Sequence, residues 1–312
     1  MPTDERPLRL PETVGWGLAL AVGTAIISGV AVYTNAIAVR EFDDATLFTT
    51  LKNGVAAMGL AAVVLASAPA RAGVRHLSGR QWLELGAIGI LGGGLAFILF
   101  FNGLALASAP SAAFIHKTLF IWVAVLAVPL LGERFGVLQL GALAVLAGSQ
   151  LLIAPMTGVS WGIGEALIAL ATGLWAVETI LARHLLRDVP SSVGAAGRMG
   201  IGLCVLLGAT AASGRGDALT ALTATQWLWV LLTGTLLTAY VGTWYAALRR
   251  APATAVTAIL VLAAPITGAL TVLAGGPGPL APVGAGYVLA LVGVTLTVLA
   301  VQRRRRAAEA TR

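Results

Sequence analysis

Long apolar runs alternate along the whole chain with short clusters of charged residues, proline and glycine. Each run holds about 20 mostly apolar residues, which is the length an α-helix needs to cross the hydrocarbon layer of a bilayer. The runs are too long for the strands of an outer-membrane barrel, and they lack period-two alternation. The pattern therefore predicts ten membrane-spanning helices. We place them at residues 14–38, 45–67, 82–103, 109–131, 136–154, 159–182, 193–213, 226–248, 252–274 and 282–301.

Composition supports a membrane protein. The chain is 58% hydrophobic and 11% charged, whereas a soluble domain carries about 25% charged residues. So much apolar surface cannot be hidden in one water-soluble core, so we predict an all-α integral membrane protein. The single cysteine, Cys204, excludes a disulfide within the chain. No histidine and cysteine spacing typical of a zinc site occurs, and we expect no metal and no cofactor.

Landmarks of the first half recur in the second half. Trp16 returns as Trp161, a displacement of 145 (161 − 16). Gln81 returns as Gln226 at the same displacement. We therefore predict two five-helix repeats at 14–154 and 159–301, followed by a basic tail at 302–312. Because five is an odd number, the second repeat enters the membrane from the opposite side, and the repeats are inverted.

The distribution of arginine predicts the orientation. With ten spans, both termini lie on one side of the membrane, and that side carries fifteen arginines in its tails and loops. They are Arg6, Arg9, Arg71, Arg75, Arg80, Arg134, Arg183, Arg187, Arg249, Arg250, Arg303, Arg304, Arg305, Arg306 and Arg312. Only Arg40 and Arg215 fall on the other side. The positive-inside rule therefore predicts cytoplasmic termini.

The net charge of +7 does not indicate a nucleic-acid partner. The run Arg303–Arg306 directly follows the last span. We interpret it as an orientation signal that can also attract anionic lipid headgroups.

An ordered set of small residues, glycines and one acidic loop residue occurs in the first half. It consists of Ala105-Leu106, Ala109, Ala113, Leu131-Gly132-Glu133, Gln139, Gly141 and Gly148, and Trp175-Ala176 of the sixth span fits as well. This set resembles the EamA domain of the drug/metabolite transporter superfamily. The resemblance covers nearly the whole chain as two EamA-like repeats.

That resemblance implies a multi-pass carrier of small metabolites in the bacterial inner membrane, often acting outward. It implies a central cavity lined mainly by the first, third, fourth, sixth, eighth and ninth helices. The fifth and tenth helices would form a scaffold or contact face, whose small residues would permit a homodimer.

The two halves depart from this pattern in different ways. The second half has Gly275 where the first has the acidic loop residue Glu133. The family often has a proline in the middle of the fourth and ninth helices. Pro265 supplies it in the second half, but Val123 stands in the first. Proline alone is therefore not expected to bend the fourth and ninth helices in the same way.

Ionisable residues within a span are costly and are candidates for function. His116 and Lys117 lie about a third of the way into the fourth span, and their repeat equivalents are Ala258 and Ile259. A binding site for an asymmetric substrate need not repeat, so we predict that Lys117 lines the cavity and contacts a substrate anion such as a carboxylate. His116 is a second candidate, and it could instead carry a coupling proton because histidine titrates near physiological pH.

Glu178 lies one turn after Trp175 on the same face of the sixth span. This pair could bind a cationic or amino group of the substrate, or Glu178 could relay a proton. Alternatively, Glu178 pairs with Arg183 or with Lys117. Tyr33 is the repeat equivalent of Glu178, and we include it among the candidate substrate-binding residues.

Lys52 and Arg198 are repeat equivalents near the beginning of the second and seventh spans. They are candidates for a symmetric pair of gate or vestibule charges. The alternative is that their long stems reach the headgroups or tie a helix end to neighbouring carbonyls.

Asn102, Trp122 and Trp244 fall on spans that the resemblance assigns to the cavity, so they complete the predicted substrate-binding set. Trp122 could instead serve helix packing, and tryptophan is also an ordinary interfacial anchor. The run Gly92-Gly93-Gly94 in the third span predicts a hinge or a widening of the cavity.

These features favour a secondary transporter that acts by alternating access on a small polar or amphipathic metabolite. Lys117 against Glu178 favours a zwitterion such as an amino acid. No nucleotide-binding motif occurs, so we do not expect ATP hydrolysis by this chain to drive transport. Protons, exchange or the solute gradient could drive it instead. The alternatives are a non-transporting scaffold or regulator and an intramembrane enzyme. The latter lacks a recognisable nucleophile, base or metal motif.

Overall fold

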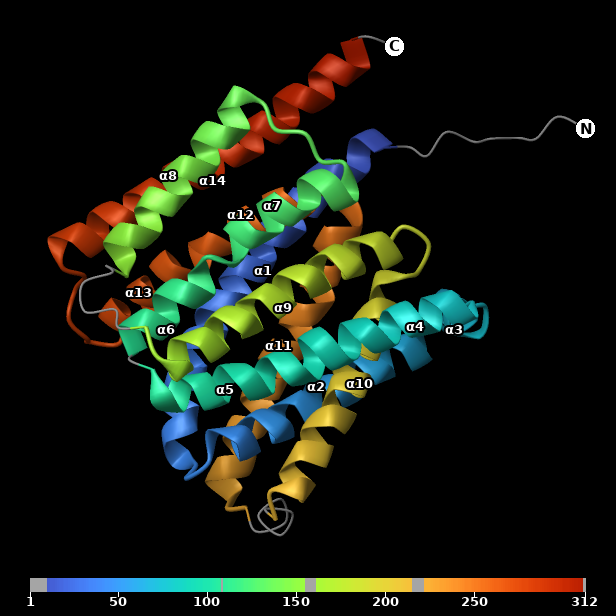
Figure 1. Ribbon diagram of the computed structural model, residues 1–312, viewed down its shortest axis with the longest axis vertical. Helices are drawn as coiled ribbons and strands as arrows, with labels where there is room; N and C mark the ends of the chain where they lie inside the picture. The colour runs from blue at the N-terminus through green and yellow to red at the C-terminus, as the bar shows by residue number, and fades with distance from the viewer. Residues whose placement is uncertain (1–9, 108, 155–160, 215–221, 311–312) are drawn as a thin grey trace, which may run out of the picture.

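The computed structural model describes residues 10–107, 109–154, 161–214 and 222–310. The described residues form helices joined by short connections (Figure 1). Residues 159 and 160, where the predicted sixth span begins, lie outside them. The same holds for Arg6, Arg9, Arg215 and Arg312 among the residues used to predict orientation.

The prediction of a ten-span helical membrane protein is confirmed. Within the described residues, nine helical stretches are long and apolar enough to cross a membrane. A tenth, Val137–Ile153, is apolar but shorter. It is the fifth predicted span.

The described part of the first half contains ten helical elements. They are α1 (Leu10–Ala38), η1 (Val39–Glu41), α2 (Ala45–Ala66), α3 (Ala68–Arg75), α4 (Gly79–Ile88), the π-helical η2 (Gly89–Leu95), α5 (Ala96–Leu106), α6 (Ala109–Lys117), α7 (Leu119–Leu131) and α8 (Val137–Ile153). The third span therefore comprises α4, η2 and α5, and the fourth comprises α6 and α7. Helix α3 was not predicted.

The second half contains seven helical elements within the described residues. They are α9 (Ile163–Leu185), α10 (Ser191–Ala212), α11 (Ala224–Arg250), α12 (Ala253–Ile259), η4 (Leu260–Leu262), α13 (Ala263–Leu273) and α14 (Ala281–Ala310). Helix α14 continues to Ala310, so Arg303–Arg306 of the predicted basic tail lie on this helix.

The recurring glutamines mark equivalent helix starts. Ser78 and Gln81 form a capping box at the beginning of α4, in which each side chain accepts a hydrogen bond from the other residue's backbone N–H. Thr223 and Gln226 form the same arrangement at the beginning of α11. A capping box satisfies N–H groups that have no partner within the helix. Part of the sequence repeat is therefore a repeated helix signal.

The fifth and tenth spans pack side by side, as α8 and α14 do in Figure 1. Their close approach depends on glycine. A Cβ added at Gly286 would lie 2.7 Å from Ile153 Cγ1 and 3.0 Å from Ser149 O, and one added at Gly293 would lie 2.7 Å from the Leu146 side chain. Small residues let membrane helices approach closely. Any larger residue would force the two helices apart.

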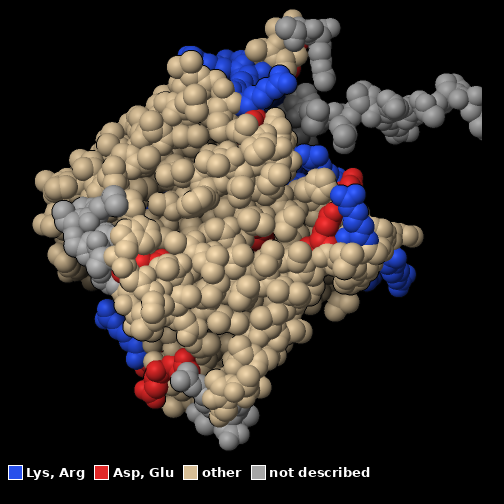
Figure 2. Space-filling view, in the orientation of Figure 1, with Lys and Arg blue, Asp and Glu red and all other residues tan. Residues whose placement is uncertain are grey.

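The two ends of the bundle differ in charge. Helix α1 begins and α14 finishes at the same end, at the upper right of Figure 1. Figure 2 shows Lys and Arg side chains gathered along that end, whereas the broad surface between the ends is mostly uncharged. An apolar band between two charged ends is the surface expected of a membrane-spanning bundle.

Candidate functional site

The fourth span is interrupted directly after its lysine. Helix α6 ends at Lys117, and α7 begins one residue after Thr118. Thr118 Oγ1 donates to Ile115 O at 2.6 Å, and Trp122 Nε1 donates to Thr118 Oγ1 at 3.2 Å. A threonine hydroxyl that bonds a nearby carbonyl competes with the helical ladder. The break therefore arises without proline.

The ninth span is interrupted at the matching position. Leu260, where the short η4 turn begins, is the repeat equivalent of Thr118 (118 + 142). Pro265 is the third residue of α13, where its missing N–H would have no helical partner in any case. Its ring would clash with the carbonyl of Val261 in a continuous helix. The regular α-helix is thus interrupted at equivalent points of the two repeats through different chemistry.

A cavity of about 350 Å³ lies beside these two breaks. Its polar and charged lining residues are Ser28, His116, Lys117, Gln150, Thr257, Thr267, Thr271 and Tyr287. The lining also includes Val32 near the end of α1 and Ile153 at the end of α8. The cavity therefore lies in the half of the bundle that is farther from the beginning of α1 and the end of α14.

The lining differs from the expectation based on family resemblance. The first, fourth and ninth spans line the cavity as expected, but Gln150 and Tyr287 come from the fifth and tenth spans. No described residue of the third, sixth or eighth span lines it. The third and sixth spans instead pack against each other: Phe97 and Phe100 of the third span contact Trp175 of the sixth, with ring centroids 5.3 and 5.4 Å apart.

Two lining residues carry a polar atom that is buried and has no hydrogen-bond partner within the described structure: His116 Nδ1 and Gln150 Oε1. The other end of the Gln150 amide donates to Ser149 Oγ at 3.1 Å. A buried polar atom without a partner is unfavourable unless water or a ligand satisfies it. His116 and Gln150 line the cavity together with Lys117, and each leaves one polar atom for a bound water or solute to satisfy.

Trp175 joins this cavity to a second polar cluster. Its ring lies 5.0 Å from that of His116, and its Nε1 donates to Gly92 O at 3.0 Å. Gly92 lies in the π-helical segment η2, where the change of register interrupts the ordinary i to i−4 ladder. The same carbonyl accepts a hydrogen bond from Arg198 Nη2 at 3.1 Å.

The second cluster is a buried ion pair between the sixth and seventh spans. Arg198 Nε lies 3.3 Å from Glu178 Oε1, and the two side chains are 10% and 3% exposed. Tyr245 of α11 donates to Glu178 Oε1 at 2.5 Å. Glu178 therefore pairs with Arg198, not with Arg183 or Lys117. Neither member of the pair lines the cavity.

Lys52 does not share the environment of its repeat equivalent Arg198. Its Nζ donates to Asn35 Oδ1 at 3.2 Å and lies 5.1 Å from the centre of the Phe48 ring. Arg198 instead lies deep among α9, α11 and η2. The two basic residues thus differ in burial and in partners within this structure.

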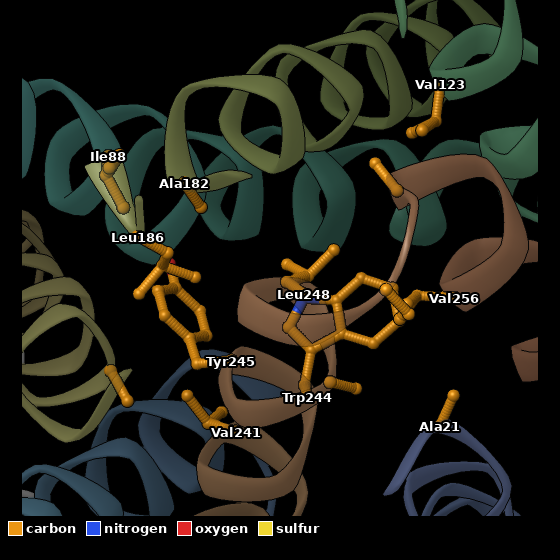
Figure 3. Packing of buried hydrophobic residues seen from close by; sticks show 14 of the residues in the cluster. Ala21, Ile88, Val123, Ala182, Leu186, Val241, Trp244, Tyr245, Leu248 and Val256 are labelled. Atoms are coloured by element: carbon orange, nitrogen blue, oxygen red, sulfur yellow. The ribbon is translucent and has the colours of Figure 1, made fainter. Parts of the chain in front are cut away.

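The remaining predicted site residues lie away from the cavity lining. Trp122 is 49% exposed, and the Asn102 amide donates to the Ile98 carbonyl of its own helix. Tyr33 is half-buried. Trp244 is packed in the hydrophobic core among Leu248, Val256 and neighbouring residues (Figure 3).

Several lining residues were missing from the sequence prediction, notably Gln150, Thr267 and Tyr287. Gln150 carried a usable signal, because an amide inside an apolar span is costly unless it is bonded or functional. The threonines carried none, since a threonine in a membrane helix can bond its own backbone. Thr267 Oγ1 does so, and it also lies 2.9 Å from Gly29 O.

The comparisons with known proteins bear on both halves of this bundle. The model of the EamA-like transporter family matches residues 15–154 and 162–299. The chain belongs to the EamA-like transporter family. The suspected resemblance is thereby confirmed, and this EamA-like transporter is a multi-pass membrane protein of a non-enzymatic transporter family.

Solved structures support the fold of this EamA-like transporter. Twenty-nine chains match. One, titled "Crystal structure of protein", has a TM-score of 0.73 and 19% sequence identity, and the match covers 92% of this chain and 98% of that one. At this identity the likeness shows the fold alone. A comparison with curated proteins gives no match. Among the described residues, no group of three or more histidine, cysteine or acidic side chains could hold a metal ion.

Proposed function

We propose that this EamA-like transporter carries a small polar metabolite with an anionic group, such as an amino acid or a related compound, by alternating access. The observation that carries the proposal is the cavity of about 350 Å³ with Lys117 in its wall. Its volume is within the range of about 300–1,000 Å³ typical of ligand pockets.

The chemistry of the wall favours an anionic group at Lys117. No described acidic side chain lines this cavity, so the ammonium group has no carboxylate opposite it there. Glu178, for which pairing with Lys117 was one alternative from the sequence, is neutralised by Arg198 at 3.3 Å. An amino group of a zwitterion would instead be accepted by Gln150 Oε1, which is buried without a partner in the described structure. His116 Nδ1 provides a further polar contact.

The broken fourth and ninth spans support alternating access. Interrupted helices in transporters place free backbone groups near the substrate, at the interface of inverted repeats. Both breaks occur at repeat-equivalent positions, and residues on either side of each break line the cavity. We infer that the two halves of these spans tilt against each other as the cavity changes the side to which it is exposed.

The structure is consistent with a state closed at the arginine-rich end. There, Glu133 Oε1 accepts a hydrogen bond from Ala253 N at 2.7 Å, and its other oxygen is bonded by the Thr254 hydroxyl. This contact ties the first repeat to the beginning of α12. Glycine at position 275 provides no such side chain at the opposite end. We propose that the arginine-rich end, with both termini, is cytoplasmic and that transport is outward.

The test is transport by the full chain in proteoliposomes. Vesicles loaded with a mixture of amino acids and related metabolites would be assayed for uptake and counterflow, with and without an imposed pH gradient. Lys117→Met removes the charge and keeps the length of the side chain. We expect it to abolish counterflow of anionic or zwitterionic solutes.

The matched control is Arg40→Gln, which removes one positive charge from an exposed residue in η1, away from the cavity. It should transport like the wild type. Solute movement that depends on the imposed pH gradient would assign proton coupling. Solute counterflow that does not depend on the pH gradient would assign exchange. Unchanged rate and half-saturating concentration in Lys117→Met would contradict the proposed site.

A further inference from the structure

A second pocket lies at the opposite end of the bundle from the transport cavity. It encloses about 230 Å³. The loop that follows α7, the beginning of α8, the beginning of α12 and the end of α14 surround it. Its charged and polar lining residues are Glu133, Arg134, Gln139, Thr254, Arg304 and Arg305. The proposed transport mechanism assigns no ligand to this pocket.

The pocket is electropositive. Three arginines and one glutamate line it, so the formal charge of its wall is +3 − 1 = +2. Within the described part of the chain, neither Arg134 nor Arg304 has an ion-pair partner. Arg305 pairs with Glu309 at 2.8 Å. The carboxylate of Glu133 is directed to the backbone and hydroxyl groups of α12.

One buried donor is left without a partner at this pocket. Gln139 is 4% exposed, and its Nε2 has no hydrogen-bond partner in the described structure. Gln139 lies in the first turn of α8, whose N-cap residue, Gly136, has no side chain to satisfy the free N–H groups. The positive end of a helix dipole and unsatisfied N–H donors favour a bound anion. A Cβ at Gly136 would lie 3.3 Å from Arg304 Nη2, so glycine keeps room for this arginine.

We infer that this pocket binds a phosphate group, with Arg134 and Arg304 as charged donors and Gln139 as the buried neutral donor. Arginine matches phosphate oxygens with its planar array of N–H groups. The pocket lies where the apolar part of α14 gives way to Arg303–Arg306, the level at which phospholipid headgroups lie. Val14, Phe135 and Val301 supply an apolar wall against which an acyl-glycerol stem can pack.

The position of the pocket gives a bound phosphate a structural consequence. Glu133 and Thr254 line it and also form the contact between the first repeat and α12. A ligand there touches both repeats at the end of the bundle that this structure holds closed.

The experiment uses the purified full chain in detergent and native mass spectrometry. Short-chain phosphatidylglycerol, phosphatidylcholine and inorganic phosphate are titrated in separate arms. We expect one saturable phosphatidylglycerol site and much weaker phosphatidylcholine binding. The double variant Arg134→Gln/Arg304→Gln should weaken binding by about tenfold for each arginine lost, or about 1.4 kcal/mol each, because each loses a charged hydrogen-bond donor to the phosphate.

The matched control is Arg303→Gln/Arg306→Gln, which removes the same charge from neighbouring exposed residues that do not line the pocket. It should bind nearly as the wild type does. Gln139→Leu leaves the charge of the pocket unchanged and should still weaken phosphatidylglycerol binding. Non-specific attraction between charges would not be affected by this variant. All variants are first checked for wild-type thermal stability by tryptophan fluorescence.

Saturable binding of inorganic phosphate alone, displaced by no lipid, would assign the site to a soluble phosphate compound. Binding of phosphatidylglycerol without binding of inorganic phosphate would assign it to a lipid headgroup. Both results support a phosphate site. Absence of saturable binding in every arm, or equal weakening in the two double variants, would overturn the inference.

Discussion

Removal of Arg198 should destabilise the protein far more than removal of any surface arginine. Its guanidinium lies 3.3 Å from Glu178 and also donates to Gly92 O. In Arg198→Met, the carboxylate of Glu178 would remain 3% exposed, with the Tyr245 hydroxyl as its remaining partner. Breaking a buried ion pair on one side costs about 3–5 kcal/mol because it leaves an uncompensated buried charge.

The double variant Arg198→Met/Glu178→Leu tests the cause of that loss. Replacing both members of a buried pair by apolar residues is often nearly neutral. Tyr245 would lose its acceptor, which costs roughly 1–3 kcal/mol for a buried hydroxyl. The double variant should therefore be more stable than the single variant Arg198→Met, although it removes more of the native contacts.

The assay is equilibrium unfolding in mixed micelles, with helicity and tryptophan fluorescence followed as the denaturing detergent increases. Arg80→Gln is the surface control, because the Arg80–Glu84 pair at the beginning of α4 has side chains 79% and 18% exposed. An exposed pair of this kind contributes about 0–1 kcal/mol. Loss of less than about 1 kcal/mol in Arg198→Met, or a double variant no more stable than the single one, would refute the reasoning.

Two further predictions follow from close contacts. Gly92→Ala would place a Cβ 2.2 Å from Glu178 Cγ, so we expect overpacking to lower the free energy of unfolding by about 1–3 kcal/mol. Gly86→Ala, which has open space at its Cβ, is the control in the same unfolding assay. Glu133→Ala removes the hydrogen-bond acceptor for Ala253 N and should cost about 0.5–2 kcal/mol, as loss of a helix cap does. It should also make a cysteine introduced into the cavity wall, in a Cys204→Ser chain, more accessible to thiol reagents added at the arginine-rich end; unchanged stability and accessibility would contradict a role in closure.

The sequence predicts the spans well because the bilayer imposes a length and an apolar composition on each one. The first predicted span, 14–38, is α1, which ends at Ala38. The fifth, 136–154, is α8, Val137–Ile153. The interruption of the fourth span within its length could not be predicted in this way. Thr118 interrupts the fourth span through a local hydroxyl contact, and threonine is common in unbroken helices.

The candidate site was predictable only in part. Lys117 and His116 stand out in an apolar span, and both line the cavity. The pairing of Glu178 with Arg198 depends on how two separate helices are rotated, and sequence spacing carries no information on that rotation. The contribution of Gln150 likewise depends on the close packing of α8 against α14, which the order of residues alone does not determine.

The most direct test of the account is protection of the cavity by a transported solute. Ser28 lines the cavity, so Ser28→Cys would be made in a chain whose single cysteine is changed by Cys204→Ser. We predict that a solute transported in a Lys117-dependent manner slows alkylation of residue 28. Labelling of an Arg40→Cys variant, at an exposed residue outside the cavity, should stay unchanged. Equal labelling of residue 28 with and without that solute would contradict the assignment of the cavity as the transport site.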